Sequence, residues 1–180
     1  MSTQTHADIE IASQPEIWAK TAEFAPSTFH KLPKKGERVA VVGCGSSWFM
    51  SMSYASLREA AGHGETDVYA GSEFNYGRKY DRIVSISRSG TTTEIVDLLG
   101  KISTPSTILT AIHDSPVEKL ATETIIMDFA DEESVLQTRW ATAALGLLRA
   151  SLGFDLASIV KDAEAADEVF ELLMGNEVAP

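Results

Sequence analysis

At 180 residues, the chain is long enough for one domain with a full hydrophobic core, and 44% hydrophobic with 23% charged residues is typical of a globular protein. Its net charge of -11 argues against nucleic acid or an anionic membrane as a partner, because both are polyanions. No apolar run approaches the ~18 residues of a membrane span, and residues 1–8 lack the pattern of a signal peptide. A single cysteine, Cys44, excludes an internal disulfide and fits a reducing compartment. We therefore expect a cytoplasmic protein.

The N-terminal region predicts a helix over residues 7–24, in which Pro15 marks a break or a first turn. A loop rich in proline and glycine then leads to residue 37. The positions of this helix that we expect to be buried are Ile11, Ile17, Trp18 and Phe24.

Short apolar runs that are rich in β-branched residues alternate with amphipathic segments through the middle of the chain. The runs predict strands at residues 38–42, 66–70, 83–86, 106–111 and 124–127. The segments between and after them predict helices at residues 48–61, around 95–99, at 116–121 and at 134–151, and a helical turn at 72–76. Such alternation indicates an α/β fold, a three-layer sandwich with a five-stranded parallel sheet. We expect right-handed crossovers and the flavodoxin-like strand order 2-1-3-4-5.

Two loops rich in hydroxyl groups follow the first and third predicted strands, at residues 43–47 and 87–92. Each precedes a predicted helix, whose free N–H groups and dipole favour an anion such as phosphate. Trp48 replaces the third glycine of a dinucleotide fingerprint, and the second loop lacks the lysine of a P-loop, so we expect no cofactor. The alternative is that the hydroxyls only cap two helices. Two such loops at neighbouring strand ends favour ligand binding.

The remaining polar residues are weaker candidates for chemistry. His113 follows the fourth predicted strand, although a surface or turn position is the simpler interpretation. Glu132 and Glu133 precede a predicted helix and could only complement its dipole. Cys44 is a nucleophile candidate, with a small buried turn residue as the better interpretation. No pair of histidines has the spacing of metal ligands, and we expect no metal site.

Taken together, these segments resemble the sugar isomerase (SIS) domain family over residues 9–153. Residues 9–15 resemble the leader before the isomerase half of glutamine–fructose-6-phosphate aminotransferases, and Gly43-Cys-Gly-Ser-Ser47 is similar to the Cys-Gly-Thr-Ser loop of those enzymes. Gly71-Ser-Glu-Phe74 and Ser87-Arg-Ser-Gly-Thr-Thr92 resemble the family's Ala-Ser-Glu-Phe turn and Ser-Gln-Ser-Gly-Glu-Thr loop. Residues 132–138 are similar to its Glu-Ile-Gly-Val-Ala-Ser-Thr segment, and Arg88 in place of glutamine resembles the tagatose-6-phosphate isomerase branch.

This resemblance implies a phosphosugar-binding domain of an isomerase that acts on a hexose or amino-hexose phosphate through an enediol. Its implied catalytic groups are a glutamate, a histidine and a lysine, yet Tyr76 stands at the histidine position and Ala60, beside Glu59, at the glutamate position. The catalytic residues are therefore unknown, with Glu132, Glu133 and His113 as weak candidates. The phosphosugar contacts that the motifs imply are Ser46, Ser47, Ser87, Arg88, Ser89, Gly90, Thr92, Val135 and Gln137.

We expect three parts: an N-terminal helix and linker (1–37), the SIS domain (38–153) and an acidic C-terminal helix (154–180) that leads to a second SIS domain. The resemblance implies a homodimer or pairing with that second domain. A non-catalytic sugar-phosphate sensor and a single-domain isomerase completed between subunits remain alternatives. The apolar stripe of the last helix is a candidate contact surface, formed by Leu156, Ile159, Val160, Ala163, Phe170 and Leu173.

Overall fold

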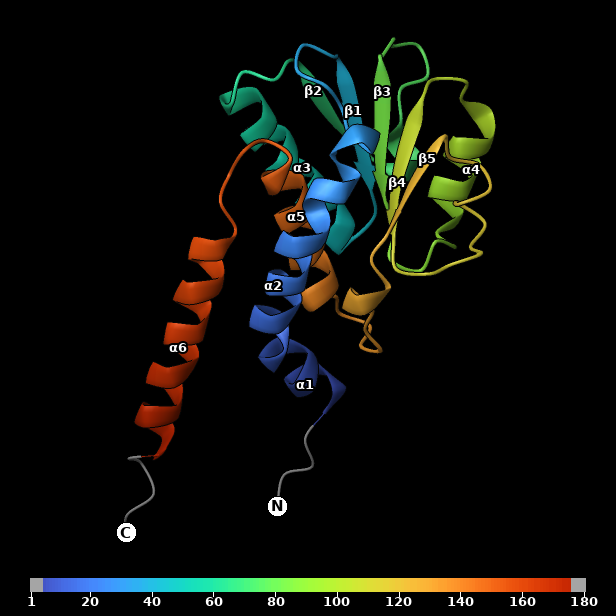
Figure 1. The fold of residues 1–180 in the computed structure, drawn as a ribbon. Helices are drawn as coiled ribbons and strands as arrows, with labels where there is room; N and C mark the ends of the chain where they lie inside the picture. Colours follow the sequence, from blue (N-terminus) through green and yellow to red (C-terminus); the bar gives the residue numbers. More distant parts are fainter. Residues whose placement is uncertain (1–4, 176–180) are drawn as a thin grey trace.

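The structure, a computed structural model, describes the backbone of residues 5–175 and the side chains of residues 5–166. An all-parallel sheet of five strands lies at its centre, with the order β2-β1-β3-β4-β5 (Figure 1). This confirms the predicted α/β sandwich and its strand order, and each strand lies within one residue of its predicted bounds. The strands are β1 (Val39–Gly43), β2 (Thr66–Ala70), β3 (Arg82–Ile86), β4 (Ser106–Thr110) and β5 (Glu123–Ile126).

Helices cover both faces of the sheet because its central strands are apolar on both sides. On one face, α2 (Gln14–Phe24), α3 (Ser46–Ala60) and α5 (Arg139–Ala150) pack on side chains such as Val41. On the other face, α4 (Thr93–Lys101) packs on Val42 and its neighbours. The two hydrophobic cores therefore meet at β1, every residue of which is buried.

The predicted N-terminal helix is two helices, α1 (His6–Ala12) and α2, which meet at Ser13. Pro15 lies in the first turn of α2, as its fixed φ favours, and a 3₁₀ helix, η1 (Ala25–Lys31), follows α2. Ile17 is buried, but Ile11 is 52% exposed on α1, so its predicted burial is wrong. The break at Ser13 turns α1 away from the core that α2 covers.

Two further predicted helices differ from the structure. Residues 116–121 form turns, because the Val117 N–H donates to the Gly90 carbonyl (3.3 Å) and ties this segment to another loop. The predicted helix at 134–151 begins only at Arg139, because the Glu132 carboxylate accepts hydrogen bonds from the Thr138 N–H (2.9 Å) and hydroxyl (3.0 Å) at the N-cap. Short 3₁₀ turns follow β2 (η2, Gly71–Glu73, near the predicted turn at 72–76) and β5 (η3, Asp128–Ala130).

A buried arginine joins the segments that enter β1 and β2. Arg58, at the end of α3, is fully buried and donates to the carbonyls of Lys34, Glu37 and Gly64 and to the Thr66 hydroxyl at 2.8–3.1 Å. A buried guanidinium needs such partners, because an unpaired buried charge is costly. Arg58 therefore stabilises the end of the sheet where the strands begin.

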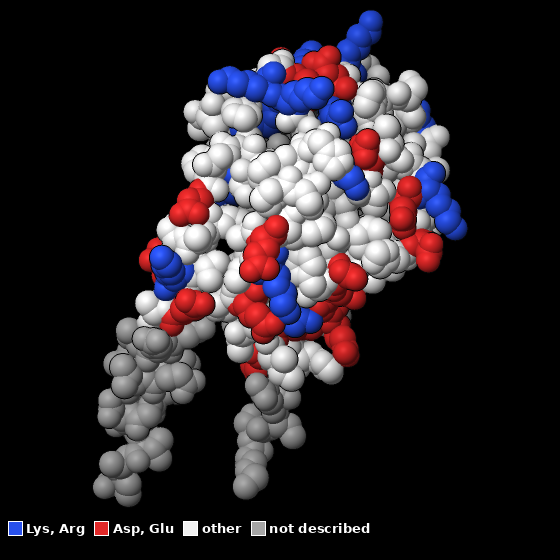
Figure 2. Space-filling model, viewed as in Figure 1, with Lys and Arg blue, Asp and Glu red and all other residues white. Residues whose placement is uncertain are grey.

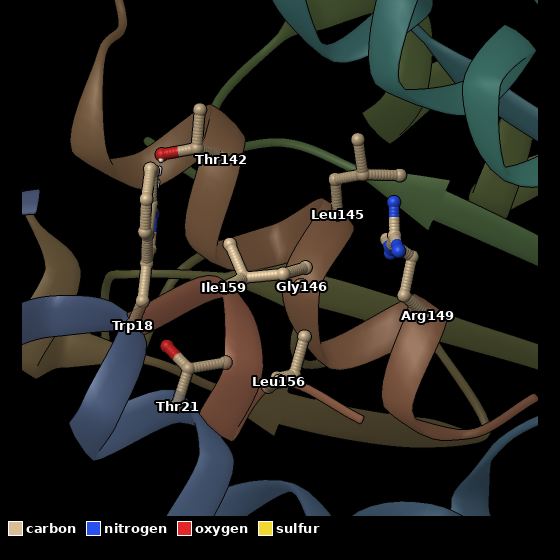
Figure 3. A pocket seen from close by; sticks show the side chains of 8 residues that line it. All are labelled: Trp18, Thr21, Thr142, Leu145, Gly146, Arg149, Leu156 and Ile159. Atoms are coloured by element: carbon tan, nitrogen blue, oxygen red, sulfur yellow. Dashed lines mark hydrogen bonds between the residues drawn. The ribbon is translucent and has the colours of Figure 1, made fainter. Parts of the chain in front are cut away.

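The last helix, α6 (Ala157–Gly175), runs beside α2, and Leu156 and Val160 are buried at its start (Figure 1). The side chains of Phe170 and Leu173, which the predicted stripe includes, lie outside the described residues. None of the helices that the structure describes combines the length and apolar character that a membrane span requires. A cavity of about 180 Å³ remains between α2, α5 and α6 (Figure 3), and its walls are Trp18, Thr21, Thr142, Leu145, Gly146, Arg149, Leu156 and Ile159.

This cavity leads to a stability prediction at Gly146, a glycine within α5. A Cβ at Gly146 would meet Leu156 Cδ1 at 3.7 Å and Thr21 Cγ2 at 3.8 Å, which is ordinary van der Waals contact. We expect Gly146→Ala to raise the free energy of unfolding by about 1–2 kcal/mol, through helix propensity plus one buried methyl group.

Gly100→Ala is the matched control, because a Cβ at this glycine of α4 would meet nothing within 4 Å. It should stabilise by helix propensity alone, about 1 kcal/mol or less. Urea denaturation of both variants checks the prediction. A destabilised Gly146→Ala variant would mean that α6 leaves no room for the methyl group.

Candidate functional site

The two predicted loops start from paired residues at the carboxyl edge of the sheet. Gly43, the last residue of β1, pairs in register with Ile86, the last residue of β3. A Cβ at Gly43 would lie 2.6 Å from the backbone carbonyl group of Ser47, so only glycine lets the chain turn so tightly into α3. The loops at 43–47 and 87–92 therefore lie side by side, as the sequence predicts.

Helix α3 begins directly in the first loop, at Ser46, with Gly45 as its N-cap residue. Ser46 is half-buried and Ser47 is buried. Among the described residues, no side chain caps this helix end. The first turn of α3 thus keeps N–H groups that an anion in the loop could accept.

The hydroxyl groups of the second loop bond to one another instead of capping α4. Ser87 Oγ and Thr92 Oγ1 are 2.8 Å apart, and the Thr91 hydroxyl donates to Ser89 Oγ (2.9 Å). No side-chain hydrogen bond caps α4 among the described residues, although Thr92 is its N-cap residue. The alternative interpretation, two capped helices, therefore does not describe this arrangement.

Gly90 allows this loop to fold tightly against the next one. Its φ is +64°, and a Cβ there would lie 2.5 Å from the Ser115 side chain. Nearby, the Arg88 carbonyl accepts from the Ala111 N–H (2.9 Å) and the Thr110 hydroxyl (3.0 Å). The loop is thus held from β4 as well as from β3.

The Arg88 side chain leaves its own loop and contacts the segment after η3. Its Nη1 donates to the Glu132 carbonyl and lies 3.8 Å from the Asp131 carboxylate. The guanidinium is therefore a link between the loop at 87–92 and the segment at 131–138. Its one positive charge lies next to the hydroxyl groups of Ser87 and Thr92.

The segment at 131–138 forms a further wall at this edge. Val135 is 95% exposed, whereas Gln137 is half-buried and its Oε1 is buried without a hydrogen-bond partner among the described residues. The Glu132 carboxylate is occupied by the N–H and hydroxyl of Thr138. It therefore acts as a helix cap in this structure.

The other weak catalytic candidates point to solvent. The Glu133 side chain is 78% exposed and lies 3.5 Å from the His6 ring. The His113 side chain is 62% exposed and pairs with Asp128 at 3.4 Å. Glu59 accepts from the Thr66 N–H (2.8 Å) where β2 begins, at the far end of the sheet from both loops.

The wall at 131–138 is held from outside by a residue that the sequence pattern did not reveal. Glu10 of α1 is only 3% exposed, and its Oε1 accepts from the N–H groups of Glu133 (2.6 Å) and Ser134 (3.1 Å). Burial raises the pKa of the Glu10 carboxyl, but bonds from Ser134 and Glu133, with Arg139 nearby, outweigh burial and lower that pKa below its usual value. The only signal was its position in the leader motif, which marks a residue but gives it no role.

The charge around the site is mostly negative. Figure 2 shows Lys and Arg gathered at the end of the molecule where the strands begin, and Asp and Glu over most of the opposite half. No residue of the two loops lines the cavity of Figure 3. Any anion at the loops must therefore be held by local N–H and O–H donors and by Arg88, since the wider field does not attract it.

Sequence comparison finds two relatives at low identity, and no family model matches the chain. The chain is 26% identical over 121 residues to a glutamine–fructose-6-phosphate aminotransferase (isomerizing) of Lactiplantibacillus plantarum, and 26% identical over 127 residues to the enzyme of that name from Thermotoga maritima. These matches cover 63% and 67% of this chain but only 20% and 21% of those proteins. The chain thus spans about a fifth of the length of the relatives it matches.

Solved structures of low sequence identity share the fold over nearly the whole chain. Tagatose-6-phosphate ketose/aldose isomerase from Escherichia coli has a TM-score of 0.77 at 14% identity, over 96% of this chain and 55% of that one. Vibrio vulnificus NanR in complex with ManNAc-6P has a TM-score of 0.61 at 20% identity, over 98% and 72%. A protein of Escherichia coli CFT073 in complex with another sugar phosphate has a TM-score of 0.63 at 19% identity, over 89% and 94%.

The environment of Cys44 predicts an unreactive thiol. Burial raises the pKa of Cys44; the Gly71 N–H lowers it and the nearby Glu94 carboxylate raises it further. Because little thiolate exists at neutral pH, we expect iodoacetamide to alkylate Cys44 at pH 7.5 several-fold more slowly than it alkylates the urea-unfolded chain. Mass spectrometry over time measures both rates. Faster alkylation of the folded chain would instead indicate an activated nucleophile.

Proposed function

We propose that this SIS domain, an assignment that the matches in sequence and in fold support, binds a sugar phosphate at the carboxyl edge of β1 and β3. Two proteins of the same fold were solved with sugar phosphates, one of them ManNAc-6P. The four motifs that resemble the family lie on one edge of the sheet or in the segment linked to it by Arg88. Phosphosugar binding is the function that these observations favour.

One observation carries the proposal: two neighbouring helices begin at this edge without side-chain caps among the described residues. Their hydroxyl-rich loops and first-turn N–H groups supply donors to a dianionic phosphate. In our proposal the phosphate lies in the loop at 87–92, where Ser87, Ser89 and Thr92 donate to it. The sugar lies toward Ser47 and the segment with Val135 and Gln137.

For the complete protein we propose isomerisation of a hexose or amino-hexose phosphate through an enediol. This reaction needs a group that moves a proton between C1 and C2. Glu132 is engaged as a helix cap, while Glu133 and His113 are exposed. A second SIS domain or another subunit would therefore supply the acid–base groups, and a sensor would bind the same ligand without turning it over.

Calorimetric titration with fructose 6-phosphate, glucosamine 6-phosphate and inorganic phosphate tests the proposal. We expect the sugar phosphates to bind, and Ser87→Ala to weaken them about tenfold or more, because a hydrogen bond to a charged group is lost. Ser103→Ala, an exposed serine beyond the C-terminal end of α4, is the control and should leave the affinity unchanged.

The same samples are assayed for isomerisation, which separates the alternatives. Binding without turnover agrees with a binding half or a sensor. Turnover by this chain alone would contradict our assignment of the acid–base groups to another domain. If neither the sugar phosphates nor phosphate binds, the proposed function is wrong.

A further inference from the structure

We propose that Glu10 of α1 is a positioning residue, which holds the segment at 131–134 in the conformation that the binding site needs. The proposal rests on the proposed function only for its effect on sugar affinity. The contact itself is a property of the fold. It assigns a role in the site to a helix that lies outside the sheet and its two loops.

Glu10 satisfies two consecutive amides that have no place in a helix or strand. Residues 133 and 134 form a bend, and their N–H groups both donate to Glu10 Oε1 at 2.6 and 3.1 Å. Buried backbone amides need an acceptor, and an irregular segment cannot supply its own. A carboxylate that accepts two N–H groups is a strong acceptor, because the bonds are charge-assisted. Glu10 is therefore a specific holder of this bend.

The same short segment is tied to the phosphate loop from its other side. Arg88 donates to the Glu132 carbonyl, next to the amides that Glu10 holds. Arg139 of α5 donates to the Asp131 carbonyl and, at 3.2 Å, to the Ser13 hydroxyl between α1 and α2. Three side chains from three parts of the chain thus fix four consecutive residues. Loss of Glu10 would release the bend and move the partner of Arg88.

The consequence differs for the two parts of the ligand. The loop at 87–92 is also held by β4, through bonds to the Arg88 carbonyl and through the Ser115 contact of Gly90. Phosphate donors in that loop therefore do not depend on Glu10. Val135 and Gln137 follow the bend directly, so the sugar contacts do. Glu10 should affect affinity for a sugar phosphate more than affinity for phosphate alone.

Glu10→Ala and Glu10→Gln test this role, with Glu16→Ala as the matched control. Glu16 is an exposed glutamate of α2 whose partner is Lys20 (2.6 Å). Hydrogen exchange by NMR reports the amides of Glu133 and Ser134. We expect both to exchange about tenfold faster or more in Glu10→Ala, because each loses its acceptor. Glu10→Gln keeps an acceptor oxygen and should restore most of the protection, while Glu16→Ala should match the wild type.

Calorimetry on the same variants measures the effect on binding. We expect Glu10→Ala to weaken fructose 6-phosphate about tenfold and to leave inorganic phosphate within about twofold, with recovery in Glu10→Gln. Unchanged exchange at residues 133 and 134 would overturn the contact. Faster exchange with unchanged sugar affinity, or an equal loss for both ligands, would overturn the positioning role. A wild-type chain that binds no sugar phosphate would instead refute the proposed function, and the exchange data would still decide the contact.

Discussion

The parallel pairing of β1 with β3 is the constraint on which the candidate site depends. It sets Gly43 opposite Ile86, so both chains leave the sheet at the same level. Helices α3 and α4 then start from one edge but cover opposite faces of the sheet. The first turns of both helices can therefore address one ligand, as at the switch point of other doubly wound sheets. A register shift of one residue would move the loops apart and expose the apolar faces of the strands.

Two glycines and a set of internal hydroxyl bonds give this edge its chemical character. Gly43 lets α3 begin immediately after β1, and Gly90 lets the second loop lie against Ser115. Ser87 and Thr92 bond to each other, so a ligand that displaces this bond finds two donors already close together. Arg88 is held by Glu132 and Asp131 and adds a positive charge whose direction is fixed before a ligand arrives. The site is preorganised by backbone geometry more than by net charge, which is why a chain of charge -11 can present an anion site.

The sheet could be predicted from the sequence because its signals are local: β-branched runs, hydroxyl-rich loops and helical spacing follow one another in order. The start of α5 could not, because the apolar residues Val135 and Leu136 continue a helical pattern, and only the Glu132 carboxylate, bound to Thr138, shows where the helix begins. Glu10 was missed for a related reason. A glutamate on a short polar helix is normally solvated, and its partners lie 123 and 124 positions away. Local patterns thus predicted the loops, and long-range hydrogen bonds completed the third wall.

The two ends of the sheet use polar groups in opposite ways. Where the strands begin, Arg58 is fully buried and directs its donors to the segments around it, so this end is closed and serves stability. Where the strands end, helix donors remain without side-chain caps among the described residues, and the Oε1 of the half-buried Gln137 has no partner there. Uncapped helix ends forgo part of the stability that capping gives. Such a deficit is expected at one edge of a fold when a ligand, and not the chain, is to provide the missing acceptors.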